Sequence, residues 1–223
     1  MDFGRALRFH DGMKTTLALL LCLAAPLAAE SLTGSGTVKT ETRTLTAYTA
    51  IDAGGALELT ITCGKDLHCE VTADDNLLPA ITTAVEGDTL KIGTNGSIST
   101  SSGIKIALSV PDLHKLTLSG AGKVALTGVK NDALALNLTG ATNVTASGRT
   151  HALTIEISGA GKIAADDLKA DDATVICSGT GAVDVSASGT LTATVSGVGR
   201  VRYSGDPKSV QKHVSGVGSV SPR

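Results

Sequence analysis

The sequence has 223 residues, of which 42% are hydrophobic and 18% are charged, with two Phe, two Tyr and no Trp. Its formal net charge is −2, so the chain lacks the basic surface that binds nucleic-acid phosphates. The shortage of aromatic rings also excludes a base-stacking platform for single strands. A buried core must therefore be built from Val, Leu, Ile and Ala.

The first 29 residues have the features of a secretory signal peptide. Lys14 precedes an apolar stretch over residues 15–25, and the small residues Ala28 and Ala29 follow it. We expect cleavage after Ala29 and export to the periplasm, the cell surface or the medium. The apolar stretch is too short for a membrane-spanning helix, which needs about 20 residues. No later stretch is longer, so we expect no membrane span.

Two alternatives stay open at this end of the chain. Met13 is a second candidate start, because Lys14 directly after it gives a more usual opening for a signal peptide. Cys22 makes lipidation an alternative, although Leu21 stands where a lipidation site requires a small residue. In either case we expect the mature chain, residues 30–223, to form a single domain.

Six copies of a short motif divide the second half of the chain into nearly equal units. Each copy has Ser or Thr, then Gly, then three variable residues and Val or Ile. The copies begin at Ser119, Thr139, Ser158, Ser178, Ser196 and Ser215. The spacing of 18 to 20 residues is typical of a solenoid, in which each repeat forms one coil.

Each unit also has the periodicity of β-strands. Before the motif, apolar residues alternate with others, as at Leu134, Leu136 and Leu138, and a second set such as Val124 and Leu126 follows it. A unit of about 19 residues cannot bury its apolar face alone, so we expect stacked, paired coils. The predicted fold is all-β, a parallel β-solenoid in the form of a right-handed single-stranded β-helix. We expect the motif glycines to supply positive φ angles at the corner.

Residues 30–103 are also β-rich but not repetitive. Alternating apolar residues over 57–73 predict one hairpin, and those over 81–92 predict a second around Glu86-Gly87-Asp88. Residues 94–103 are rich in Ser, Thr and Gly, which predicts a flexible loop. We expect this region to cap one end of the stack and the coils to occupy residues 104–223.

Several further motifs occur in a fixed order along the chain. They are Gly34-Ser35-Gly36 with Thr40-Glu41-Thr42-Arg43, Ile51-Asp52, Ala73-Asp74-Asp75-Asn76-Leu77-Leu78, and the Leu118-Ser119-Gly120-Ala121-Gly122 repeats. In this order they resemble the bacterial family called "putative auto-transporter adhesin, head GIN domain", over residues 34–221. The resemblance implies a secreted or envelope-facing β-helical protein of unknown biochemical function, with no catalytic residues to transfer.

Four carboxylates lie close together in the third coil, at Asp166, Asp167, Asp171 and Asp172. Clustered oxygens suit Ca²⁺, and β-helical polysaccharide lyases use such sites together with a basic residue. Asp is equally an ordinary turn residue. We expect turn residues here, with no metal and no cofactor, and keep a carbohydrate-active β-helix as the alternative function.

Three cations occupy the same position after the motif in alternate coils, at Lys123, Lys162 and Arg200. Stacked about 10 Å apart, they could contact an extended anionic polymer, or they could simply keep the surface soluble. The histidines show no metal-ligand spacing, and we find no nucleophile elbow and no phosphate loop. These histidines are His68, His114, His151 and His213.

Two cysteines, Cys63 and Cys69, share the inward parity and flank a short loop, which predicts a hairpin disulfide in an oxidising compartment. Two separate buried thiols are the alternative. Cys177 replaces an aliphatic residue of the inward row, and we expect it to be inert core.

Taken together, these features predict an exported, non-enzymatic module for adhesion or another surface interaction. Its partner would be an envelope polysaccharide or a protein surface, and the sequence does not identify which. A binder of small hydrophobic ligands is disfavoured, because a narrow solenoid fills its own interior with side chains.

Overall fold

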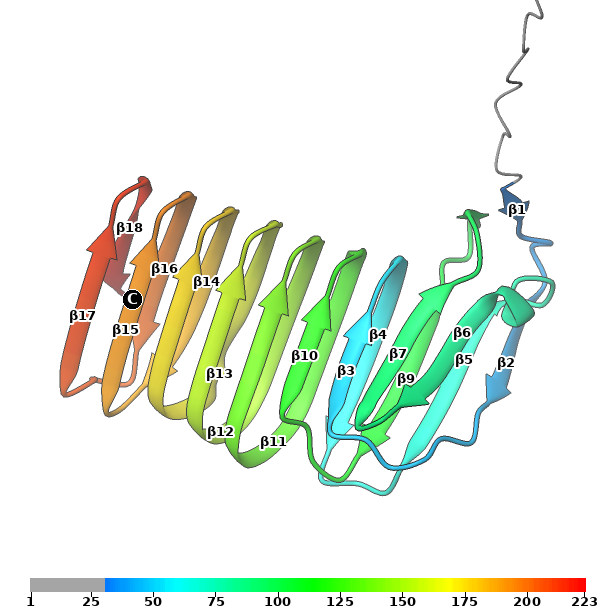
Figure 1. Cartoon of the computed structure of the whole chain (residues 1–223), viewed down its shortest axis with the longest axis horizontal. Helices are drawn as coiled ribbons and strands as arrows, with labels where there is room; N and C mark the ends of the chain where they lie inside the picture. The colour runs from blue at the N-terminus through cyan, green and yellow to red at the C-terminus, as the bar shows by residue number, and fades with distance from the viewer. Residues whose placement is uncertain (1–30) are drawn as a thin grey trace, which may run out of the picture.

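The computed structural model describes residues 31–223, and the predicted signal peptide, residues 1–29, lies outside the described residues. The described chain is a β-solenoid of about five stacked parallel turns (Figure 1), which confirms the predicted fold class. Its first strands are β1 (Leu32–Thr33), β2 (Val38–Thr42), β3 (Ala50–Ala53), β4 (Ala56–Cys63), β5 (His68–Asp74), β6 (Ile81–Glu86), β7 (Thr89–Thr94), β8 (Ile98–Ser99) and β9 (Lys105–Val110). The remaining strands are β10 (Lys115–Leu118), β11 (Ala121–Leu138), β12 (Ala141–Ile157), β13 (Ala160–Cys177), β14 (Thr180–Ala187), β15 (Thr190–Val195), β16 (Val198–Ser204), β17 (Ser209–Val214) and β18 (Val217–Pro222).

The coils form two facing stacks of parallel strands. One stack runs β7, β3, β10, then the second halves of β11, β12 and β13, then β15 and β17. The other runs β9, β4, then the first halves of β11, β12 and β13, then β14, β16 and β18. A narrow corner at the Ser-Gly motif joins the stacks on one side, and a wide turn joins them on the other (Figure 1).

Register places equivalent side chains directly above one another in the core. Leu138 pairs with Ile157, Ile157 with Cys177, and Cys177 with Val195, and all four are at most 1% exposed. Each such aliphatic side chain stabilises the fold by roughly 1.5–3 kcal/mol relative to exposure. The alternation in the sequence therefore identified the core columns correctly, including Leu134 and Leu136.

The solenoid begins earlier than residue 104. The coil of β3 and β4 lies between the coil of β10 and β11 and the coil of β7 and β9, although it precedes both in sequence. Its corner is Gly54-Gly55, where the amide of Ala121 donates to the carbonyl of Gly55. Because Gly54 replaces the Ser or Thr of the motif, the sequence spacing did not reveal this coil.

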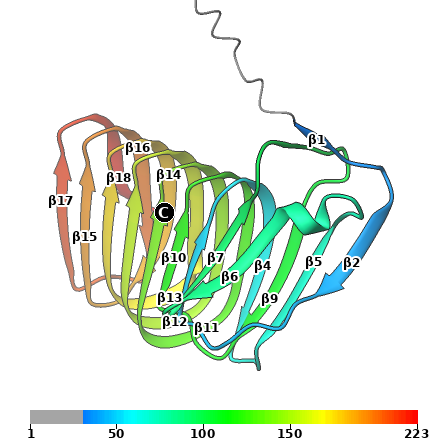
Figure 2. The ribbon, with the colours of Figure 1, turned by 45° about the vertical axis from the view of Figure 1, so that its right-hand side comes forward.

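Antiparallel strands cover the N-terminal end of the stack (Figure 2). The hairpin of β6 and β7 forms as predicted, with Val85 opposite Leu90. The predicted hairpin of β4 and β5 is wrong, because β9 lies between them, parallel to β4 and antiparallel to β5. β9 pairs with both strands and joins their apolar rows. Its buried Ile106 stands opposite Leu59 of β4 on one side and Val71 of β5 on the other.

Residues 94–103, expected to be a flexible loop, contain strand β8, which pairs with β1. The buried carboxylate of Asp74 holds this segment by accepting hydrogen bonds from the hydroxyls of Thr100, at 2.5 Å, and Ser102, at 3.0 Å. A buried carboxylate needs such partners, because without them its desolvation is costly. The segment is thus part of the cap.

A column of glycines lies at the narrow corner, where any larger residue would be excluded by steric overlap. A Cβ at any of them would overlap the carbonyl oxygen of the glycine in the coil below, as at Gly140 over Gly120. The same carbonyl accepts a hydrogen bond from Ala141, so it cannot turn away. These glycines do not have positive φ, so the predicted reason for them is wrong. The column consists of Gly120, Gly140, Gly159, Gly179, Gly197 and Gly216.

At the other end of the stack, β17 and β18 form the last described coil. Lys212 of β17 pairs with the fully buried Ala193 and so continues an inward column of the core. Its ammonium donates to the carbonyl of Val220 at 3.1 Å and lies 5.0 Å from the centroid of the Tyr203 ring. A cation thus stands where earlier coils place aliphatic side chains.

The glycine column predicts a large effect of a single added methyl. Gly140→Ala should lower the free energy of unfolding by about 2–4 kcal/mol, because either the strand pairing or the corner must shift. Gly93→Ala is the matched control, since its nearest contact, Thr82 Oγ1, lies at an ordinary 3.5 Å. Urea denaturation of both variants is the measurement, and equal stability of the two would contradict the steric account.

The stacked core predicts that a charge placed in a buried column will destabilise the fold. Val183→Asp should cost several kcal/mol, because Val183 is 1% exposed between Ile163 and Val201 and a carboxylate there would have no partner. Val198→Asp is the control, since Val198 is 55% exposed. If thermal melts showed the two variants to be equally stable, the inward assignment of Val183 would be wrong.

Candidate ligand surface

The cations predicted from the repeat share one column on the outer face of the second stack. Lys123 pairs with Asn143, Asn143 with Lys162, Lys162 with Ala182, and Ala182 with Arg200. All three cations are exposed. Since paired strands are about 4.8 Å apart, neighbouring cations are separated by about 10 Å. We refer to this set as the strand-face column.

Shallow hollows accompany the strand-face column. Lys123 lines one of about 430 Å³ and Arg200 one of about 620 Å³. The Arg200 hollow owes its room to Gly181, Gly199 and Gly218, which stand in consecutive coils and carry no side chain. On the N-terminal side the column continues to Glu58, opposite Lys123. The surface is polar and open, and suits an extended ligand better than a small enclosed one.

Three of the four carboxylates of the third coil are held by different partners, and the fourth is exposed. Asp166 pairs with Arg223, and Asp172 accepts from the amide of Thr190 at 2.7 Å. Burial alone would raise the pKa of Asp166, but the hydrogen bond from Arg223, a backbone hydrogen bond and the charges of Arg223 and Lys169 together outweigh it, so the pKa is lowered. Asp171 pairs with His151, whereas Asp167 is exposed. Over residues 31–223, no group of three or more His, Cys, Asp or Glu side chains is placed to hold a metal ion.

Of the four histidines within residues 31–223, three lie beside an acidic side chain. His68 is 3.2 Å from Glu70, and His114 is 2.8 Å from Asp112. His151 contacts Asp171. His213 lies on the outer face of β17, paired with Thr194. Each of the three pairs is exposed, so the contacts contribute little to stability.

The predicted disulfide is not formed, because Cys63 and Cys69 are free and buried. They flank β9, where Cys63 stands opposite Val110 and Cys69 opposite Leu108, so a third strand separates them. Burial raises the pKa of the Cys63 thiol to about 11, with a smaller contribution from the charge of Asp112. Cys177 is also free and fully buried in a core column, as expected.

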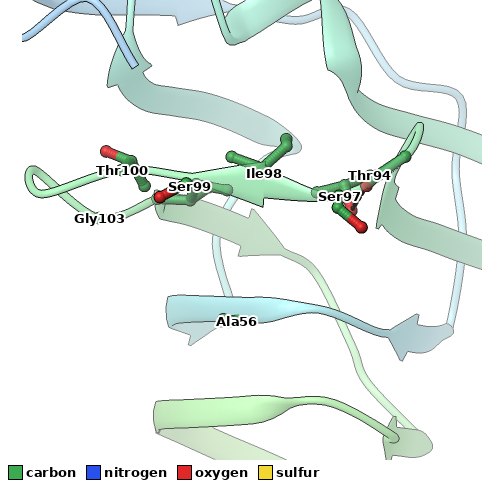
Figure 3. Close-up of a pocket in the computed structure, with 9 residues that line it drawn as sticks. Ala56, Thr94, Ser97, Ile98, Ser99, Thr100 and Gly103 are labelled. Carbon is green, nitrogen blue, oxygen red and sulfur yellow. Dashed lines mark hydrogen bonds between the residues drawn. The ribbon is translucent and has the colours of Figure 1, made fainter. Parts of the chain in front are cut away.

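A cleft of about 510 Å³ lies beside β8 at the capped end (Figure 3). Thr94, Ser97, Ser99 and Thr100 line it with hydroxyl groups, and Ala56 lies at its other side. It holds no charged side chain, and its Thr100 hydroxyl is already committed to Asp74. The cleft therefore offers hydrogen bonding but no group that could act as a general base.

Sequence reasoning missed one cluster of cations, which lies at the wide turn. Lys130, Arg149 and Lys169 stand opposite one another in three consecutive coils. The signal was absent from the motif alignment because the wide turn varies in length from coil to coil, with register shifts after Leu126 and Thr145. Counting four residues back from the first apolar residue of the following strand, at Leu134, Leu153 and Ala173, would have aligned all three cations.

The architecture defines a β-helical domain, with parallel coils in register and an antiparallel cap at one end. Within the described part of the chain, no helix is long and apolar enough to cross a membrane. A family model described as "Putative auto-transporter adhesin, head GIN domain" matches residues 47–207. The chain belongs to this family, as the sequence motifs indicated.

Solved structures share the fold. A putative adhesin from Bacteroides fragilis is 23% identical, with a TM-score of 0.68 over 86% of this chain and 100% of its own. A putative adhesin from Parabacteroides merdae is 20% identical, with a TM-score of 0.57 over 87% and 100%. A putative lipid binding protein from Parabacteroides distasonis is 23% identical, with a TM-score of 0.52 over 87% and 100%. Comparison with curated protein sequences gives no match.

Because the three thiols are buried, we expect them to react slowly with alkylating reagents in the folded protein. Iodoacetamide at about pH 8 should leave Cys63, Cys69 and Cys177 unmodified, because burial blocks access and a raised pKa removes the reactive thiolate. After unfolding in urea without reductant, all three should react. The readout is intact mass of purified residues 30–223, and modification of Cys177 alone would show that the disulfide exists.

The raised pKa of Cys63 also makes the free energy of unfolding depend on pH. Because the Cys63 pKa is raised on folding, the unfolded chain loses this proton first. The associated stability is present below the ordinary thiol pKa of 9.0 and is lost as the pH rises towards about 11.

Proposed function

We propose that this protein is an exported, non-enzymatic module that attaches to a surface through its long, regular outer faces. The observation that carries the proposal is the register of the coils, which stacks the outward side chains of successive coils in straight columns, one of them with a cation at every second coil from Lys123 to Arg200. An extended partner that repeats along its own length can then make the same contact several times. Membership in the head GIN domain family supports an adhesive role.

Export to the periplasm, the cell surface or the medium is part of the proposal. It is supported by the signal-peptide features of residues 1–29 and by the adhesin description of the family. We propose an envelope polysaccharide as the partner, in preference to a protein surface. The strand-face column of Lys123, Lys162 and Arg200 is one candidate contact, since its charges form a line rather than a pocket.

The geometry gives less support to an enclosed ligand. The space between the two stacks is filled by aliphatic columns such as Leu136, Ile155 and Val175, each fully buried. The hollows lie on the outside, and the cleft beside β8 is lined by Ser and Thr hydroxyls together with Ala56, Ile98 and Ile104. A lipid-binding role, which is stated for one structural neighbour, would need an apolar cavity in place of these features.

Purified residues 30–223 provide the test of the proposed function. We expect saturable binding to isolated bacterial envelopes or their polysaccharides, measured by co-sedimentation, with no change in polymer length. A carbohydrate-active enzyme would instead release unsaturated uronate products in the presence of Ca²⁺, seen as ultraviolet absorbance. Turnover that is lost in Asp171→Asn but retained in Asp132→Asn, at a fully exposed position of the same turn region, would overturn the proposal.

A further inference from the structure

Three basic side chains form an unbroken line at the wide turn, and we call them the wide-turn column. Lys130 of β11 pairs with Arg149 of β12, and Arg149 pairs with Lys169 of β13. All three are exposed, whereas Val129 and Leu168, which precede two of them, are buried, so the cations face solvent. Successive cations are therefore about 4.8 Å apart at the backbone, half the spacing in the strand-face column.

This arrangement is unfavourable without a partner. Like charges directly opposite one another on paired strands destabilise a sheet. Within residues 31–223, neither Lys130 nor Arg149 forms a salt bridge, and Lys169 donates only to the backbone carbonyl of Asp166, at 2.7 Å. The strand-face column avoids the problem, because Asn143 and Ala182 separate its cations.

The nearest acidic side chains along these strands form no salt bridge with the column. Asp132, Asp167 and Asp171 each lie two residues from one of its cations. Among residues 31–223, Asp171 contacts His151 Nδ1, and Asp132 is 3.9 Å from His151 Nε2. The column therefore borders carboxylates, but its own cations have no carboxylate partner among the described residues.

A hollow of about 270 Å³ lies beside the first two cations of the column, lined by Lys130, Arg149, Asn131, Thr150, Asp132 and His151. Asn131 is fixed there by donating from Nδ2 to the carbonyl of Leu113 at 2.7 Å and to Asp112 at 3.2 Å. Its Oδ1 has no hydrogen-bond partner among residues 31–223. The Thr150 hydroxyl is buried and donates to the carbonyl of Ala152 at 3.3 Å, so the free donors beside the hollow are those of the cations, which suit a carboxylate.

We propose that the wide-turn column is the binding site for an acidic polysaccharide, one bearing a carboxylate on successive sugars. This inference rests on the proposed function and names its ligand class and its main site. A linear polymer of carboxylates places one anion near each coil, and Arg149 in the centre can hold a carboxylate through two parallel hydrogen bonds. A single small anion cannot reach all three cations of a straight column, and so leaves part of the repulsion in place.

The test compares two triple variants with the same change in net charge. In one, Lys130, Arg149 and Lys169 are all replaced by Gln, and in the other Lys123, Lys162 and Arg200 are. Polygalacturonate is the probe, neutral dextran the uncharged polymer, and phosphatidylglycerol vesicles the phosphate surface. Biolayer interferometry on residues 30–223 gives the dissociation constants at an ionic strength of about 0.15 M.

We expect wild type to bind polygalacturonate but not dextran, and to prefer polygalacturonate to the vesicles. The wide-turn triple variant should weaken binding at least about tenfold and the strand-face variant by less than about threefold, because only the first set forms an unbroken line of charge. The dependence of the polygalacturonate dissociation constant on salt concentration should also become weaker only in the wide-turn variant. Thermal melts should show this variant at least as stable as wild type, since like-charge repulsion is relieved.

Three outcomes would overturn the inference. Equal weakening in both variants, or a larger loss in the strand-face variant, would mean that the wide-turn column is not the main site. Preferential binding to the vesicles would assign the column to phosphate headgroups. Failure of wild type to bind polygalacturonate would exclude this ligand class, and the envelope co-sedimentation would then report separately whether the protein binds surfaces at all.

Discussion

The close approach of backbones at the narrow corner is the constraint on which the rest of the structure depends. Each corner carbonyl points at the Cα of the coil above and bonds to the amide that follows it, so only glycine fits in that column. This contact locks the vertical position of one coil on the next. A register shift of one residue would exchange the inward and outward faces of a strand. It would expose the aliphatic columns and bury residues such as Lys123 or Arg200.

Because register is fixed at the corner, length differences are absorbed at the wide turn. The Ser-Gly corner recurs in every coil from β10 onward, whereas the pairing of β12 with β13 and of β13 with β14 slips after Thr145 and Ala165. A side chain on a strand face therefore has a predictable neighbour, while one at the wide turn does not. The two cationic columns also differ in composition: Asn143 and Ala182 interrupt the strand-face column, whereas the wide-turn column has a cation in each of three successive coils.

Sequence periodicity was sufficient for the repeated part of the fold. Alternation at Leu134, Leu136 and Leu138 identified buried positions, and the motif spacing identified the strand-face column, since both depend on local order alone. The cap was not predictable in this way. Insertion of β9 between β4 and β5 is a contact between segments distant in sequence, and it also separates the two cysteines expected to pair. That Cys63 and Cys69 both point inward can be read from the local alternation, but the alternation does not show that a third strand lies between them.

The inward Lys212 of β17 has a consequence for strand pairing at this position. It continues a column whose other members include Ala193, Val175 and Ile155, all fully buried. Any strand paired with β17 in register would have to supply an acceptor for the Lys212 ammonium or enclose it at a high desolvation cost. A polar side chain is therefore favoured over a further aliphatic one directly beside Lys212.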